Sequence, residues 1–146
     1  MEPRLPVGYR RRAVDDQLDE LFPHLPAIAL DGAKGVGKTA TATARAATVY
    51  RLDDPAAREL LAADPGRLTS APEPILVDEH QRWESSWDFV RRAVDDDPHA
   101  SRFLLTGSAT SAHTTAHSRA GRIVRLQMRS SPGELRRVDR RAGRAR

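Results

Sequence analysis

The chain has 146 residues, a length that suits one folded domain better than two. It has no cysteine for disulfides or thiolate metal sites, no apolar run near the ~20 residues of a membrane helix, and no signal-peptide core, so we expect a soluble, cytoplasmic protein. Residues 1–128 carry a net charge of −1 and residues 129–146 a net charge of +5, so the high isoelectric point does not indicate a folded nucleic-acid-binding surface.

The first half of the chain alternates between helix-like and strand-like patterns. In order, we predict a helix over 13–22, a strand over 27–30, a helix over 39–47, a strand over 48–52 and a helix over 55–63. The helix over 39–47 consists of small residues, which suit close packing on a sheet. Asp54 followed by Pro55 is a favourable helix start, with the acid as the cap and the proline as the first helical residue.

The second half continues this alternation. In order, we predict a loop over 65–74, a strand over 75–79, a helix capped by Ser85 or Ser86 and ended by 95–99, a strand over 102–108, a loop over 109–121 and a strand over 122–128. Strands that alternate with helices along the chain are typical of an α/β fold built on a parallel sheet.

The loop between the first strand and the second helix has the spacing of a phosphate-binding loop. Residues 32–39, GAKGVGKT, match G-x-x-x-x-G-K-[ST] and contain both lysines of the chain. Glycines let backbone N–H groups converge on phosphate oxygens, the Lys38 ammonium can reach the β- and γ-phosphates, and the Thr39 hydroxyl can bind Mg²⁺. A turn without a ligand can carry the same short motif, but the flanking strand and helix favour phosphate binding. The predicted nucleotide contacts are Gly32, Ala33, Lys34, Gly35, Val36, Gly37, Lys38, Thr39 and Ala40.

The strand predicted over 75–79 ends in two acids, Asp78 and Glu79. We expect this strand to lie next to the strand that precedes the loop and to place Asp78 at its carboxyl end. Ligands of parallel sheets bind at the carboxyl ends of the strands. Asp78 would then hold Mg²⁺ together with Thr39, and Glu79 would act as a general base on an attacking water. A strand that ends in solvated acids is the alternative, and the phosphate loop upstream favours the metal site.

Several stretches together resemble the AAA+ branch of P-loop ATPases, and more narrowly the bacterial and archaeal AAA ATPases that usually carry a C-terminal domain of unknown function. The stretches are YRRRAVDDQL (9–18), the phosphate loop, YRLDDP (50–55), ILVDEHQR (75–82), FLLTGSA (103–109) and AGRIVRLQMR (120–129). The resemblance implies a three-layer α/β P-loop NTPase core with a mostly parallel five-stranded sheet, which binds ATP and Mg²⁺ and is compatible with a homo-oligomer.

The resemblance also implies roles for residues outside the loop. Thr106 or Ser108 would be the sensor that contacts the γ-phosphate or the water, and Gln81 would lie beside the general base. Arg122 would be an arginine finger, with Arg119 as its rival. For each of these residues the alternative is a structural role: a polar strand end for Thr106 and Ser108, and a surface cation for Arg122.

The resemblance ends near Arg129. Relatives continue into a helical region and the C-terminal domain, whereas this chain turns into a run of arginines, at the place where the charge changes. We therefore expect a truncated or frame-shifted product without the lid over the nucleotide. The predicted organisation is an AAA-like core over 1–128 and a basic, disordered tail over 129–146, which would touch nucleic acid only by charge attraction.

The sequence leaves more than one function open. The first is an ATP-binding protein with Mg²⁺-dependent hydrolysis, in which Lys38 and Glu79 have catalytic roles. The second is a nucleotide-binding remnant or regulatory module that does not hydrolyse. A small-molecule kinase would share the loop, but the adjacent acids count against it, and a nucleic-acid-binding protein ranks last because its charge lies in the tail.

Overall fold

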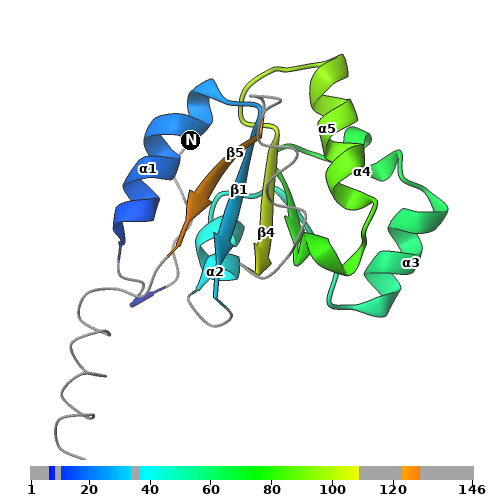
Figure 1. Cartoon of the computed structure of the whole chain (residues 1–146), viewed down its shortest axis with the longest axis horizontal. Coiled ribbons are helices and arrows are strands. Elements are labelled where there is room, and N and C mark those ends of the chain that lie inside the picture. Colours follow the sequence, from blue (N-terminus) through cyan, green and yellow to red (C-terminus); the bar gives the residue numbers. More distant parts are fainter. Residues whose placement is uncertain (1–6, 9–10, 34–36, 109–122, 129–146) are drawn as a thin grey trace, which may run out of the picture.

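The computed structural model describes residues 7–8, 11–33, 37–108 and 123–128 (Figure 1). The elements in chain order are helix α1 Ala13–Leu21, 3-10 turn η1 Phe22–His24, strand β1 Ala27–Gly32, helix α2 Lys38–Thr43, strand β2 Thr48–Arg51, helices α3 Pro55–Ala63 and α4 Arg67–Ser70, strand β3 Ile75–Asp78, 3-10 turn η2 His80–Arg82, helix α5 Ser86–Asp96, and strands β4 Phe103–Ser108 and β5 Ile123–Gln127. Among these helices, none is both long and apolar enough to cross a membrane.

The five strands form one parallel sheet in the order β2-β3-β4-β1-β5. This arrangement confirms the predicted α/β class and five-stranded sheet. The expectation that the strand of Asp78 lies next to the loop strand was wrong, because β4 pairs with both β1 and β3 and separates them. Since all strands run in the same direction, their carboxyl ends still meet at one edge of the sheet.

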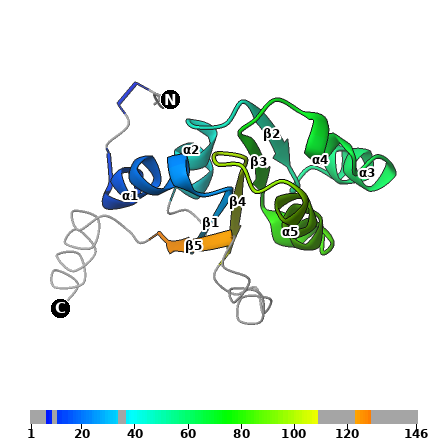
Figure 2. The ribbon, with the colours of Figure 1, turned by 90° about the horizontal axis from the view of Figure 1, so that it is seen from above.

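Helices cover both faces of the sheet. Figure 2 shows α1 and α2 on one side of the strands and α3, α4 and α5 on the other. The central strands β1, β3 and β4 are buried along nearly their whole length because each of their faces is covered. On the α5 side the core includes Ala29, Val77, Leu105 and Val94, all with no exposed surface.

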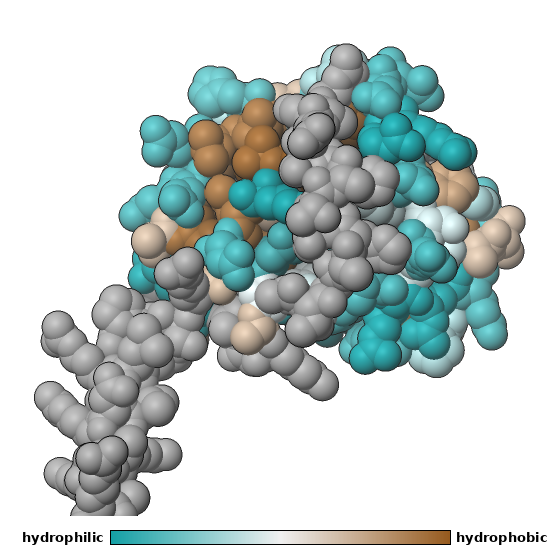
Figure 3. All heavy atoms as spheres, viewed as in Figure 1, coloured by the Kyte–Doolittle hydropathy of each residue, from teal (hydrophilic) through white to brown (hydrophobic). Residues whose placement is uncertain are grey.

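On the opposite face, α1 and α2 pack over alternate residues of the same strands. This second cluster includes Leu18, Leu30, Leu76 and Leu104, all with no exposed surface. Helix α2, which contains small residues, lies close to β1, β3 and β4, as the sequence predicted. Figure 3 shows hydrophobic side chains that reach the surface in the region of α1 and β5.

The observed elements differ from the predicted ones mainly at their ends. Helix α2 stops at Thr43, earlier than predicted, and the chain turns so that the Ala47 and Thr48 N–H groups both reach the carbonyl of Pro74 beside β3. The region predicted as a loop over 65–74 contains α4. The predicted cap of α3 is confirmed, since the Asp54 carboxylate accepts a 3.0 Å hydrogen bond from the Ala56 N–H.

Candidate functional site

The first part of the site is the junction between β1 and α2. Gly37, immediately before α2, has a φ of 91°, a left-handed conformation that favours glycine. Lys38 is 5% exposed, and its ammonium donates to the carbonyl oxygens of Gly32 at 2.5 Å and Ala33 at 3.3 Å. The Lys38 ammonium therefore lies over the start of the loop. A phosphate would have to bind there to contact it.

The second part of the site is the carboxylate of Asp78 at the end of β3. Its Oδ1 atom accepts a 2.8 Å hydrogen bond from the Thr39 hydroxyl and a 2.6 Å bond from the Thr106 hydroxyl. Asp78 is 4% exposed and Thr106 is fully buried. Oxygen atoms from α2, β3 and β4 thus converge at one point on the carboxyl edge of the sheet. Hard cations such as Mg²⁺ prefer such oxygen donors, so Thr39 and Asp78 fit a Mg²⁺ site.

Thr106 also fixes the second acid. Its hydroxyl accepts a 3.0 Å hydrogen bond from the Glu79 N–H while it donates to Asp78. Glu79 has φ 57° and ψ 51°, a conformation that non-glycine residues rarely adopt and that surrounding contacts must hold in place. The Glu79 carboxylate in turn accepts a 2.5 Å hydrogen bond from the Gln81 side-chain amide.

A glycine at the end of β4 allows η2 to lie against the sheet. A Cβ atom at Gly107 would lie 2.7 Å from His80 Nε2 and 3.1 Å from Gln81 Oε1, so any side chain there would displace the turn. Ser108, the next residue, is half-buried and lies opposite Gly32 in the register of β4 with β1. The predicted sensor positions therefore lie on the same edge as the loop, and Thr106 is hydrogen-bonded to both acids.

Sequence reasoning missed an ion pair directly before the loop. Arg125 on β5 donates to the Asp31 carboxylate at 2.7 Å, and the side chains are only 15% and 10% exposed. The Arg125 guanidinium also lies 4.4 Å from the ring centroid of Trp87 on α5. Asp31 is the residue before Gly32, so this contact links the loop to β5 and α5. The two charges lie 94 positions apart in sequence, and no spacing pattern could have revealed them.

A family model described as an AAA domain matches residues 24–131, a stretch that includes all five strands. The chain belongs to the AAA domain family. It therefore contains an AAA-type, P-loop ATPase-like domain, and the resemblance drawn from its motifs is confirmed at that level. A search of the curated proteins finds no match.

Not every predicted site residue of this AAA domain can be located. Lys34, Gly35 and Val36 in the loop, and Arg122 with its rival Arg119, lie outside the described residues. Ala40, the third residue of α2, is exposed.

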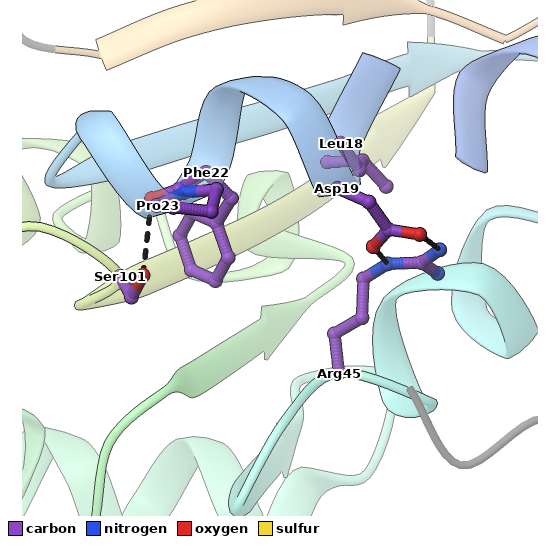
Figure 4. Close-up of a pocket in the computed structure, with 6 residues that line it drawn as sticks. All are labelled: Leu18, Asp19, Phe22, Pro23, Arg45 and Ser101. Carbon is purple, nitrogen blue, oxygen red and sulfur yellow. Dashed lines mark hydrogen bonds and ion pairs between the residues drawn. The ribbon is translucent and has the colours of Figure 1, made fainter. Parts of the chain in front are cut away.

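A separate cavity lies at the opposite, amino edge of the sheet (Figure 4). It has a volume of about 110 Å³ and is lined by Leu18, Asp19, Phe22, Pro23, Arg45 and Ser101. Its one cation is already bound, because Arg45 donates from Nε and Nη2 to the two carboxylate oxygens of Asp19, at 2.8 and 3.1 Å. These residues precede β1 and β4 or follow α2, so the cavity is not part of the candidate site.

Proposed function

We propose that this AAA domain binds ATP with Mg²⁺ and hydrolyses it. The observation that carries the proposal is the Asp78 carboxylate, which joins the hydroxyls of Thr39 and Thr106 beside the buried ammonium of Lys38. An aspartate with a purely structural role would need only hydrogen bonds to satisfy its carboxylate oxygens, and no cation or phosphate loop nearby. Here the acid, the cation and the hydroxyls come from three elements and meet beside a phosphate-loop motif, an arrangement that suits a nucleotide and a metal together.

Each residue would have a defined task. The loop N–H groups and Lys38 would bind the phosphates, and Thr39 and Asp78 would hold Mg²⁺, which neutralises charge on the β- and γ-phosphates. Glu79 would take a proton from the attacking water while the oxygen of that water bonds to the γ-phosphorus. The bond from that phosphorus to the β–γ bridging oxygen would break, releasing ADP and phosphate. Thr106 would position both acids.

The remaining assignments belong to the same proposal. Ser108 would face the γ-phosphate, and Arg122 would complete a neighbouring site in a homo-oligomer. Residues 1–128 would form the nucleotide-binding core, and residues 129–146 a basic tail that is not needed for the chemistry. An assay of a chain shortened to residues 1–128 tests that division, because nucleotide affinity should be unchanged.

A second candidate is a module that binds nucleotide without hydrolysing it. The observation in its favour is the hydrogen bond from the Gln81 amide to the Glu79 carboxylate, which occupies an oxygen that a general base would need. Hydrolysis requires that Glu79 leave Gln81 or use its second oxygen. If the contact persists with nucleotide bound and the second oxygen does not reach the attacking water, the site would bind ATP without hydrolysing it.

The test begins with a Mg²⁺-dependent titration using a fluorescent ATP analogue. Saturable binding by the wild type that Lys38→Ala loses would support the site, and no binding by the wild type would refute the proposal. Phosphate release then separates the two candidates. Turnover that falls at least ~100-fold in Glu79→Gln, in line with loss of a general base, indicates hydrolysis. Binding without turnover, with turnover appearing in Gln81→Ala, indicates the inhibited module.

A further inference from the structure

Trp87, near the start of α5, contacts two other side chains through its indole. The Arg125 guanidinium lies 4.4 Å from the centroid of this ring, and the centroid of the His80 ring lies 5.4 Å away. Trp87 is 5% exposed and His80 is 4% exposed. Arg125 pairs with Asp31, which directly precedes the phosphate loop. His80 directly follows Glu79. The indole therefore connects the start of the loop with the turn that carries the proposed general base.

The start of α5 holds η2 by a second contact. The Ser86 hydroxyl, which is fully buried, donates a 2.7 Å hydrogen bond to the carbonyl of His80. Glu79 itself has a left-handed φ of 57°, which surrounding contacts must maintain. Thr106 on β4 bonds the N–H of Glu79, and α5 holds the residue that comes next in the chain. The backbone at the proposed base is thus held from two sides.

Stability alone does not account for the contacts of the indole. In the part of the chain that the structure describes, Trp87 Nε1, Arg125 Nε and Nη2, and Asp31 Oδ1 are buried without a hydrogen-bond partner. A buried donor or acceptor without a partner destabilises the fold, and apolar side chains often replace a buried ion pair without loss of stability. The contacts that are made pass through the indole ring and the planar guanidinium. Their effect is to fix the relative position of β5, α5 and η2.

We propose that Trp87 is a positioning residue for hydrolysis, which together with Arg125 holds η2 so that the Glu79 carboxylate faces the γ-phosphate. The inference rests on the proposed function. A misplacement of ~1 Å caused by a change far from the chemistry can reduce the rate ~100-fold. Trp87 touches neither the phosphates nor the attacking water in this role, because the loop and Lys38 bind the nucleotide. Its loss should therefore slow the chemical step and leave the affinity for ATP unchanged.

Four variants separate this role from general packing. Trp87→Leu removes the ring and should slow phosphate release from bound ATP at least ~10-fold, with a dissociation constant within about twofold of the wild type. Trp87→Phe keeps a ring against its neighbours and should restore most of the rate. Arg125→Lys keeps a cation for Asp31 but loses the planar face, and should slow release in the same way. Trp83→Leu is the matched control, because that indole stacks on Phe89 instead, and it should change the rate by less than about twofold.

The experiment measures single-turnover phosphate release, and the dissociation constant of a fluorescent ATP analogue with Mg²⁺, for the wild type and the four variants. Circular dichroism confirms that each variant is folded, and Arg125→Lys provides the test if Trp87→Leu does not fold. The same substitution at Trp87 is then combined with Glu79→Gln. If the indole acts by placing Glu79, the combined variant should be no slower than Glu79→Gln alone, because no base remains to be placed.

Several results would overturn the inference while the proposed function stands. These are wild-type release by Trp87→Leu, an equal loss in Trp83→Leu, and a loss in Trp87→Phe as large as that in Trp87→Leu. A weaker affinity for ATP that accounts for the slower release, or a further loss on top of Glu79→Gln, would also overturn it, because the indole would then support the domain as a whole. A wild type that binds ATP without releasing phosphate, or that does not bind it, overturns the proposed hydrolysis and the role of Trp87 with it.

Discussion

Thr106→Val removes the hydroxyl that holds both acids while it preserves the shape of the side chain. The hydroxyl donates a 2.6 Å hydrogen bond to the Asp78 carboxylate and accepts a 3.0 Å hydrogen bond from the Glu79 N–H. Thr106 is fully buried. A hydrogen bond to a charged group contributes ~1.5–3 kcal/mol, and an unsatisfied buried N–H costs ~1–3 kcal/mol. The two contributions together span ~2.5–6 kcal/mol. Because the Thr39 hydroxyl still bonds Asp78, we take the lower half of this range and expect a loss of ~2.5–4 kcal/mol in the free energy of unfolding.

Urea denaturation followed by circular dichroism measures this loss, and Thr106→Ser is the matched control. Serine keeps the hydroxyl and loses only a methyl group, so it should cost ~1 kcal/mol. A valine variant within ~0.5 kcal/mol of the wild type, the usual range for a neutral surface change, would refute the reasoning. A serine variant as unstable as the valine variant would also refute it, because packing and not hydrogen bonding would then explain the loss.

Three further predictions concern other contacts. The hydrogen bond between His99 and Asp97 raises the pKa of His99 above its ordinary 6.5 and lowers that of Asp97 below 3.8. The stabilisation from this contact is therefore complete between pH 3.8 and pH 6.5. It is lost as pH rises through the folded pKa of His99 or falls through the folded pKa of Asp97. Urea denaturation across and beyond this pH range should show a flatter dependence of stability on pH for His99→Gln, and an unchanged dependence would contradict the prediction. Gly107→Ala should cost ~1–3 kcal/mol by thermal unfolding, because its Cβ would lie 2.7 Å from the buried His80 ring; a neutral result would mean that η2 moves freely. Arg102→Met should cost ~2–4 kcal/mol by urea unfolding, because the buried guanidinium donates to two backbone carbonyls that methionine cannot satisfy, and a gain in stability would reverse this reasoning.

Local signals in the sequence predicted much of the fold. Asp54 caps α3 because a short acid before proline can reach a backbone N–H two residues on, whatever surrounds it. The apolar runs predicted β1, β3 and β4 because both faces of these strands are covered. The meeting of Lys38, Thr39 and Asp78 at one edge followed from the common direction of parallel strands.

Contacts between distant segments could not be predicted in this way. The buried central strands have similar apolar sequences, so nothing local reveals that β4 lies between β1 and β3. The partner of Arg125 depends on how β5 docks on the sheet. This arginine looks like a surface cation in the sequence, and only the packing brings its guanidinium to Asp31.

The stacking of Arg125 on Trp87 gives the loop an optical reporter. The Arg125 guanidinium lies 4.4 Å from the centroid of the Trp87 indole. A ligand that shifts Asp31 would also move its partner Arg125, and the fluorescence of Trp87 would change with the local electric field. The chain has one other tryptophan, Trp83, which stacks on Phe89 with ring centroids 5.4 Å apart. A Trp83→Phe variant would leave Trp87 as the only tryptophan, so loop occupancy could be followed in real time with unlabelled nucleotide by exciting tryptophan selectively.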